Sequence, residues 1–253
     1  MEVAPIAPTK KLPKVTESIL TLGLVGYILR IIPLLEIIGF ILTGILWLYI
    51  YRAWRKTYFL IVSILMFVTV ASIIVSNIYS LTTFNIETVA PETTAEAIEY
   101  VNKTYEQMMS QITVISMVNN GVQVITIFLE AIGFLILYRS FPSVFRPYTF
   151  ILLIMLGITI IGGVIAMYVS LANLKTLLNE MIESFRKGEA IESPAIELRM
   201  FNALTPMVIA GIVLLIIKVV GYVMCALTVN RYKKKLLEQE VMLKEVPPPP
   251  PPI

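Results

Sequence analysis

The chain has 253 residues, of which 57% are hydrophobic and 15% charged, with a net charge of +3 and a mean hydropathy of +0.84. Several long apolar runs at this composition predict an all-α, polytopic membrane protein and exclude a soluble globular core. Histidine and aspartate are absent, and Cys225 is the single cysteine. This composition excludes disulfides within one chain and lacks the ligands that most metal and haem sites use, so no cofactor or metal is expected.

The N-terminal part is expected to be a leader followed by two apolar segments. Residues 1–14 are polar and proline-containing, which predicts a flexible cytoplasmic leader. Val15–Ile32 comes next, and its glycines Gly23 and Gly26 would let a neighbouring helix approach closely. A second segment, Pro33–Tyr51, follows, because proline is tolerated in a first helical turn but breaks a helix interior. The helix break at Pro33 has three interpretations: a tight turn between two membrane crossings, a re-entrant hairpin, or a kink in one long helix.

The positions of lysine and arginine decide the expected topology. Basic stretches at 52–56, 139–146 and 231–235 flank apolar runs and are expected to be cytoplasmic. The two long intervening loops carry ten Glu against five Lys or Arg and belong outside. Folding residues 15–51 as a hairpin keeps the basic leader inside as well. A cell-membrane location with both termini cytoplasmic then gives six segments: Val15–Ile32, Pro33–Tyr51, Thr57–Ser80, Thr113–Tyr138, Tyr148–Ser170 and Pro206–Thr228.

Two amphipathic stretches extend the fourth and fifth of these segments. Apolar side chains recur at steps of three and four over residues 95–112, and residues 171–187 repeat the pattern. Matching seams on consecutive antiparallel helices predict a coiled-coil-like stalk outside the membrane. The alternative is that each stretch lies flat on the lipid surface. Asn102 begins an N-glycosylation acceptor pattern on the predicted outer side, and residues 188–204 are expected to link the stalk to the last segment.

Residues 15–230 are thus expected to form one membrane domain that includes the stalk, and residues 231–253 a cytoplasmic tail. The tail begins as a charged helix and ends in Pro247–Pro252, which predicts a stiff polyproline II rod. Such a rod either binds an aromatic groove of a partner protein or serves as a spacer.

Ionisable residues inside membrane segments are costly and therefore mark candidate sites. Four are found here: Arg30, Glu36, Glu130 and Lys218. The first two flank a proline and are expected to reach the outer interface. Glu130 and Lys218 lie at similar depths when residues are counted from their helix ends, so they are expected to pair. Such a pair either orients two helices or relays protons or ions.

A polar cluster lies in the outer half of the fourth segment: Asn119, Asn120 and Gln123. Amides in a membrane helix make interhelical hydrogen bonds or line a permeation path, and the former is the commoner role.

Two stretches resemble an uncharacterised archaeal family of multi-span membrane proteins. The first is Gly23-Leu24-Val25-Gly26 with Ile32-Pro33 and Ile37–Leu42; the second is Leu137-Tyr138-Arg139-Ser140 with Phe145 and Gly157. The resemblance covers about half of the chain. It implies a membrane fold with no known activity, and therefore no functional residues.

The functional expectation is a non-enzymatic structural or interaction protein of the membrane. Intramembrane proteases of the metallo and serine classes need histidine, and no nucleotide-binding motif is found. The basic turns follow the topology rule and are no evidence for nucleic acid binding. We expect a homo-oligomer or a protein partner bound at the stalk or the polyproline tail. The alternative is a small ion or solute transporter or channel that uses Glu36, Glu130 and Lys218.

Overall fold

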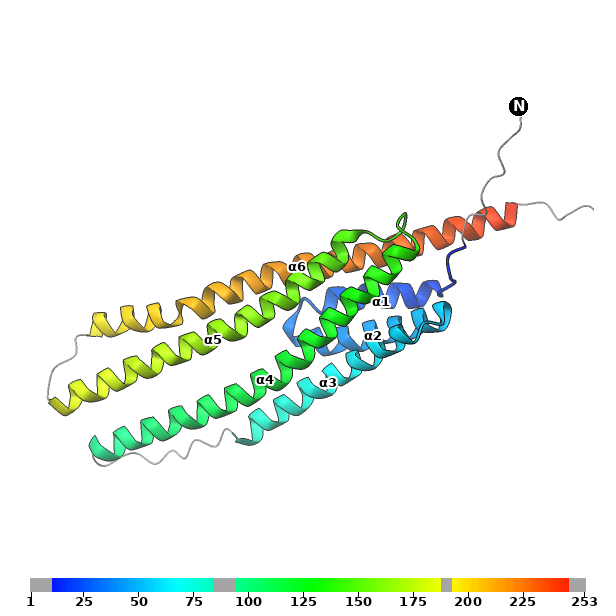
Figure 1. The fold of residues 1–253 in the computed structure, drawn as a ribbon. Helices are drawn as coiled ribbons and strands as arrows, with labels where there is room; N and C mark the ends of the chain where they lie inside the picture. Colours follow the sequence, from blue (N-terminus) through cyan, green and yellow to red (C-terminus); the bar gives the residue numbers. More distant parts are fainter. Residues whose placement is uncertain (1–10, 84–93, 188–192, 246–253) are drawn as a thin grey trace, which may run out of the picture. The chain divides into compact units, whose positions relative to one another are not determined.

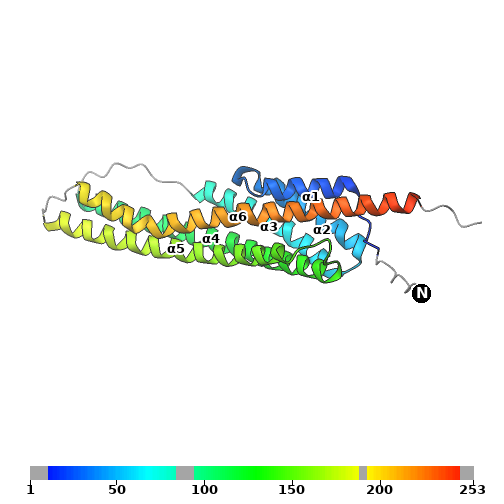
Figure 2. The same ribbon diagram turned by 90° about the horizontal axis from the view of Figure 1, so that it is seen from above.

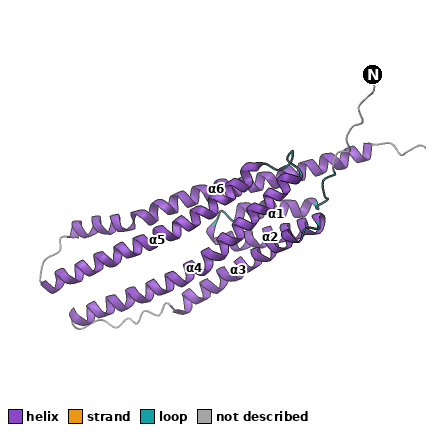
Figure 3. Cartoon of the chain, viewed as in Figure 1, coloured by secondary structure: helices purple, strands orange, loops and turns teal. Residues whose placement is uncertain are grey.

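The computed structural model describes residues 11–83, 94–187 and 193–245, and this part of the chain is helical apart from short connections, with no strand (Figures 1 and 3). The predicted all-α class is confirmed. In chain order the elements are α1 (Glu17–Leu29), the short 3-10 helix η1 (Pro33–Leu35), α2 (Glu36–Trp54), α3 (Thr57–Thr83), α4 (Thr94–Ser140), α5 (Pro147–Lys187) and α6 (Ser193–Glu245). The start of the leader, part of the outer connection and the polyproline rod lie outside the described residues.

Among the described helices, five contain a stretch that is long and apolar enough to cross a membrane. These stretches are Pro33–Trp54, Thr57–Ser80, Thr113–Ser140, Pro147–Ser184 and Ile196–Met242. The remaining helix, α1, is apolar but has 13 residues. It therefore spans about 20 Å, which is short for a hydrocarbon core of about 30 Å. The five apolar helices suggest a membrane location for a multi-pass chain.

The last three helices are much longer than a membrane is thick. They have 47, 41 and 53 residues, and at a rise of about 1.5 Å per residue each is about 60 to 80 Å long. The expected link at 188–204 differs from the structure, because α6 begins at Ser193 and continues through Pro206. Proline removes one backbone donor from a helix. The next donor, the N–H of Met207, bonds to the hydroxyl of Ser170 on α5 at 3.2 Å, which helps α6 to continue.

The described helices divide into two compact units. Unit 1 comprises Met1–Met66, Glu130–Phe150 and Tyr222–Ile253, and unit 2 comprises Phe67–Leu129 and Ile151–Gly221. The expected boundary at residue 231 falls inside α6, which has no break there.

In unit 1, α1 and α2 form an antiparallel pair that depends on glycine. A Cβ atom on Gly39 would lie 2.7 Å from the backbone nitrogen of Arg30 and 2.8 Å from the carbonyl oxygen of Gly26. One on Gly26 would lie 3.0 Å from the backbone nitrogen of Thr43. Real Cβ atoms do not come this close to backbone, so any larger residue would push the helices apart. The predicted close approach at Gly26 is confirmed.

The end of the leader is tied to the last turns of α6, which runs beside α1 (Figure 2). We call this set of contacts the terminal clasp. It comprises the Leu12 N–H on Gln239 Oε1 at 3.1 Å, Lys14 with Glu240 at 2.8 Å, and Lys233 with Glu17 at 2.9 Å. Residues 12–17 and 233–240, more than 200 positions apart in sequence, are thereby brought to the same end of unit 1.

The three basic stretches lie at the same end of unit 1 as the terminal clasp, where contacts between aromatic rings join them. The rings of Trp54 and Phe141 have centroids 5.4 Å apart at nearly right angles, and those of Phe145 and Tyr232 lie 5.3 Å apart. Each of the three basic stretches, 52–56, 139–146 and 231–235, contains or adjoins one of these rings. The stretches therefore share one end of unit 1 with the terminal clasp.

Candidate functional site

The centre of unit 1 contains a buried ion pair between Arg30 and Glu130. Arg30 follows the last residue of α1, and its N–H still bonds to the carbonyl of Gly26 at 3.1 Å. Its Nη1 atom lies 2.9 Å from Oε2 and 3.1 Å from Oε1 of Glu130, which projects from α4. Both side chains are 0% exposed. One guanidinium nitrogen thus bonds to both oxygens of the carboxylate, and both bonds are assisted by charge.

This pair corrects two expectations. Glu130 was expected to pair with Lys218, but the structure gives it Arg30. Arg30 was expected to reach the outer interface, but it is fully buried. Counting residues from helix ends gives the depth of a side chain and does not tell which neighbour it faces. The proline after Arg30 indicated a turn at the surface, and Ile32 and Leu34 in that turn are exposed. The Arg30 side chain is nevertheless buried, because it is directed to Glu130.

Two aromatic donors complete the coordination of Glu130. The Tyr27 hydroxyl donates to Oε1 at 2.5 Å, and the Trp47 indole N–H donates to the same oxygen at 3.2 Å. Both rings are buried. An indole or phenol can satisfy a buried carboxylate while its ring packs against apolar neighbours. Sequence reasoning missed both residues, although a Tyr and a Trp inside apolar segments were the available signal.

The guanidinium of Arg30 is held on its other sides by two rings. Its Cζ atom lies 4.1 Å from the ring centroid of Phe40 and 4.2 Å from that of Tyr222. Nη2 also donates to the Tyr222 hydroxyl at 2.9 Å, whereas Nε has no hydrogen-bond partner among the described residues. Arginine suits such a site because its planar group stacks on rings and bonds at its edge.

The contacts around Arg30 and Glu130 hold helices against one another, and neither charged group is exposed to solvent. Four helices supply its members: α1, α2, α4 and α6. Each carboxylate oxygen has at least one donor, and the charges neutralise each other without contact with solvent. Removing either partner would leave a buried charge, which is the costly state. Cys225 of α6 is buried in the same unit, as expected for a packing residue.

Of the remaining predicted residues, Glu36 is close enough to Tyr222 of this cluster to interact with it electrostatically. Glu36 begins α2 and Lys218 lies on α6 in unit 2; both are half-buried and have interactions of their own. In unit 2, Asn119 accepts a long bond of 3.5 Å from Ser72 of α3, and Asn120 donates to Ser116 one turn earlier in α4 at 2.9 Å. Gln123 is half-buried with a partner, and Asn102 is exposed on α4.

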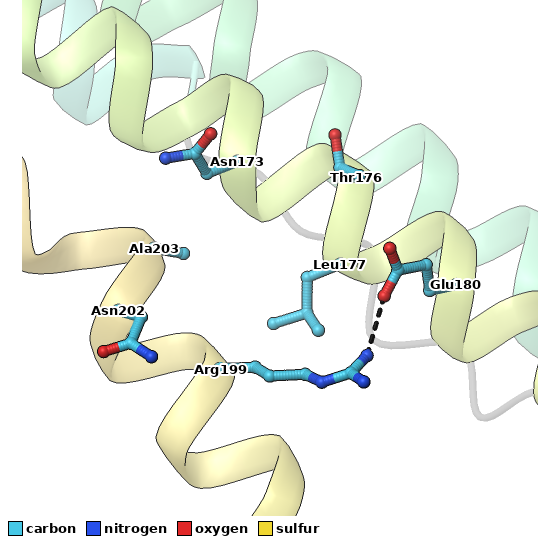
Figure 4. A pocket seen from close by; sticks show the side chains of 7 residues that line it. All are labelled: Asn173, Thr176, Leu177, Glu180, Arg199, Asn202 and Ala203. Atoms are coloured by element: carbon cyan, nitrogen blue, oxygen red, sulfur yellow. Dashed lines mark hydrogen bonds and ion pairs between the residues drawn. The ribbon is translucent and has the colours of Figure 1, made fainter.

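A polar groove lies between α5 and α6 in unit 2 (Figure 4). Its volume is about 650 Å³, within the range of small-molecule and peptide sites. Arg199 reaches across from α6 to Glu180 at 2.8 Å, and the two asparagines at 173 and 202 lie toward the other end. The pair is more than half exposed and therefore contributes little to stability.

A second, apolar groove of about 320 Å³ lies among α4, α5 and α6. It is lined by Tyr100, Thr104, Tyr105, Leu174, Leu177, Leu178, Met181 and Met200. The Tyr105 hydroxyl donates to the carbonyl of Leu171 at 2.7 Å, which joins α4 to α5. Partial burial raises the pKa of this phenol above its ordinary value of 10.0, so it stays a neutral donor throughout the physiological range. The two amphipathic stretches thus contact each other, with α6 as a third helix.

In the part of the chain that the structure describes, no group of three or more His, Cys, Asp or Glu could hold a metal ion. No protein-family model, curated protein or solved structure matches the chain. The resemblance to an archaeal membrane family therefore stays a prediction.

Proposed function

We propose that the chain is a non-enzymatic, multi-pass membrane protein whose long helices bind a protein partner or a second copy outside the bilayer. In this proposal six segments enter the membrane, with α1 and α2 as a hairpin that does not cross fully. The short α1 and its glycine-dependent packing on α2 support the hairpin. The clustering of the leader, the tail and all basic stretches at one end of unit 1 supports a cytoplasmic position for both termini.

The observation that carries the proposal is the open apolar groove among the helical extensions of unit 2. Helices that cross a membrane and stop need no such extension. Here the exposed charges Glu99, Lys103 and Glu106 on α4 and Glu183 on α5 indicate contact with water, while Leu178 and Met181 beside the groove remain only half-buried. Half-buried apolar side chains at the centre of a polar surface are typical of protein interfaces.

The buried ion pair argues against the alternative of a transporter or channel. A group that relays protons or ions must exchange its partners during the cycle. Glu130 accepts hydrogen bonds from three different side chains and is shielded from solvent, so an exchange of its partners would require α1, α2 and α4 to separate. We assign the pair the role of orienting the helices of unit 1.

One substitution in the apolar groove tests partner binding. Leu178→Glu should abolish self-association or partner capture, because it places a charge in the groove. Asn179→Glu is the matched control, since it adds the same charge at the adjacent exposed position of α5. The measurements are the mass of the full chain in lipid nanodiscs and chemical crosslinking in native membranes. Identical mass and crosslinks for wild type and both variants would refute the proposal.

Ion flux separates the two functions. Liposomes that contain the wild-type chain should show proton and ion fluxes no greater than empty liposomes. A wild-type flux well above that of empty liposomes would establish the transporter instead.

A further inference from the structure

Two adjoining turns of unit 1 carry a group of exposed cations, which we call the basic rim. Its members are Arg52, Arg55, Lys56, Arg139 and Arg146. The turns are joined by the edge-to-face contact of Trp54 with Phe141. Neither stretch, 52–56 or 139–146, contains an acidic residue. No ion pair between a rim residue and any described residue is found.

Several other cations at the same end of unit 1 form ion pairs, unlike the residues of the basic rim. Lys14 pairs with Glu240 at 2.8 Å, and Lys235 pairs with Glu238 at 2.6 Å. Lys233 is likewise neutralised within the terminal clasp. Arg231 and Lys234 of α6, like the rim residues, are without an ion pair to a described residue. The uncompensated positive charge at this end therefore lies on the two turns and the adjoining turn of α6, which is the pattern expected where an external anion supplies the neutralisation.

Arg55 occupies a backbone position that favours glycine. It ends α2 in the left-handed region, with φ 54° and ψ 29°, and among the described residues no other non-glycine has positive φ. Glycine is the usual residue at this position of a helix end. The guanidinium that stands there instead is exposed.

We infer that the basic rim binds the anionic headgroups of phospholipids in the adjoining leaflet. Both turns lie where apolar helices end, α2 and α3 on one side and α4 and α5 on the other, which is the depth of the headgroups in a bilayer. Guanidinium groups bind phosphate oxygens through paired hydrogen bonds, and cations at this depth are attracted by anionic lipid. The inference rests on the membrane position of the proposed function and is independent of binding at the unit 2 grooves.

The test compares two triple variants with the same change of net charge. The rim variant is Arg55→Gln with Lys56→Gln and Arg146→Gln. The control variant is Lys175→Gln with Arg186→Gln and Lys187→Gln, which removes three exposed cations from α5. Each full-length protein, in neutral detergent, is titrated with phosphatidylglycerol or phosphatidylcholine, and bound lipid is counted by native mass spectrometry.

Wild type and the control variant should bind phosphatidylglycerol more tightly than phosphatidylcholine. The rim variant should lose about fivefold in phosphatidylglycerol affinity for each charge removed, or on the order of 100-fold in total. Equal affinity of the wild type for both lipids, or equal losses in the two variants, would overturn the inference. So would displacement of the lipid by millimolar inorganic phosphate, because it would indicate a site for free phosphate.

A single substitution separates lipid binding from folding. Arg55→Gly removes one rim charge and supplies the residue that the left-handed backbone favours, so the melting temperature should rise or stay constant. Phosphatidylglycerol affinity should nevertheless fall about fivefold. Unchanged lipid affinity in this variant would refute the site even if the triple variant failed to fold.

Discussion

Replacing Glu130 with glutamine should strongly destabilise unit 1. Glutamine has the same shape but no charge, so Arg30 would remain fully buried without a counter-ion between the rings of Phe40 and Tyr222. Breaking one partner of a buried pair costs about 3–5 kcal/mol. For a chain of this size that corresponds to a fall in melting temperature of roughly 6–20 °C. The measurement is thermal unfolding of the purified chain in detergent, followed by near-UV circular dichroism.

A double variant distinguishes loss of the pair from loss of packing. Arg30→Met combined with Glu130→Met removes both charges and retains apolar volume, so it should be closer to wild type than either single change. Lys14→Gln, which breaks an exposed pair of the terminal clasp, is the reference and should cost less than about 1 kcal/mol. If Glu130→Gln costs no more than Lys14→Gln, the pair does not hold the helices together.

Three further changes probe the packing. Gly39→Ala should cost about 1–3 kcal/mol by overpacking, whereas Gly162→Ala, with nothing within 4 Å, should leave the melting temperature unchanged; equal effects would contradict the glycine contact. Lys233→Gln should lower the free energy of unfolding by less than about 1 kcal/mol, and only at low salt, because its partner Glu17 is half exposed. A loss of stability that persists at high salt would contradict a screened surface ion pair. Tyr105→Phe should cost about 1 kcal/mol in urea unfolding, and no change would show that its bond is not formed.

Much of the helical architecture could be predicted from the sequence because hydropathy and glycine act locally. Apolar length alone predicts the helices from Pro33 to Ser140, and Gly26 indicates where a neighbour comes close. The basic stretches share one end of unit 1, in agreement with the rule that places Lys and Arg on one side. In each case the signal lies within a few residues of the feature that it predicts.

The partners within the site could not be predicted because they depend on how helices rotate and meet. Arg30 and Glu130 are separated by 100 positions, and rotating α4 by the angle of one residue, about 100°, would point the carboxylate elsewhere. The length of α6 was missed for a related reason. Pro206 is a local signal for a helix start, but a hydroxyl from α5 lies beside it, and a single sequence contains no sign of that neighbour.

The separation of Arg30 from its counter-ion also sets an order for biosynthesis. The arginine leaves the ribosome long before Glu130 has been translated, and an unpaired cation in hydrocarbon is costly. In the proposed membrane arrangement, the α1–α2 pair would therefore stay near the water boundary until α4 is inserted. Ribosome-bound chains that stop short of α4 should leave residue 30 accessible to water-soluble reagents, and the full chain should protect it.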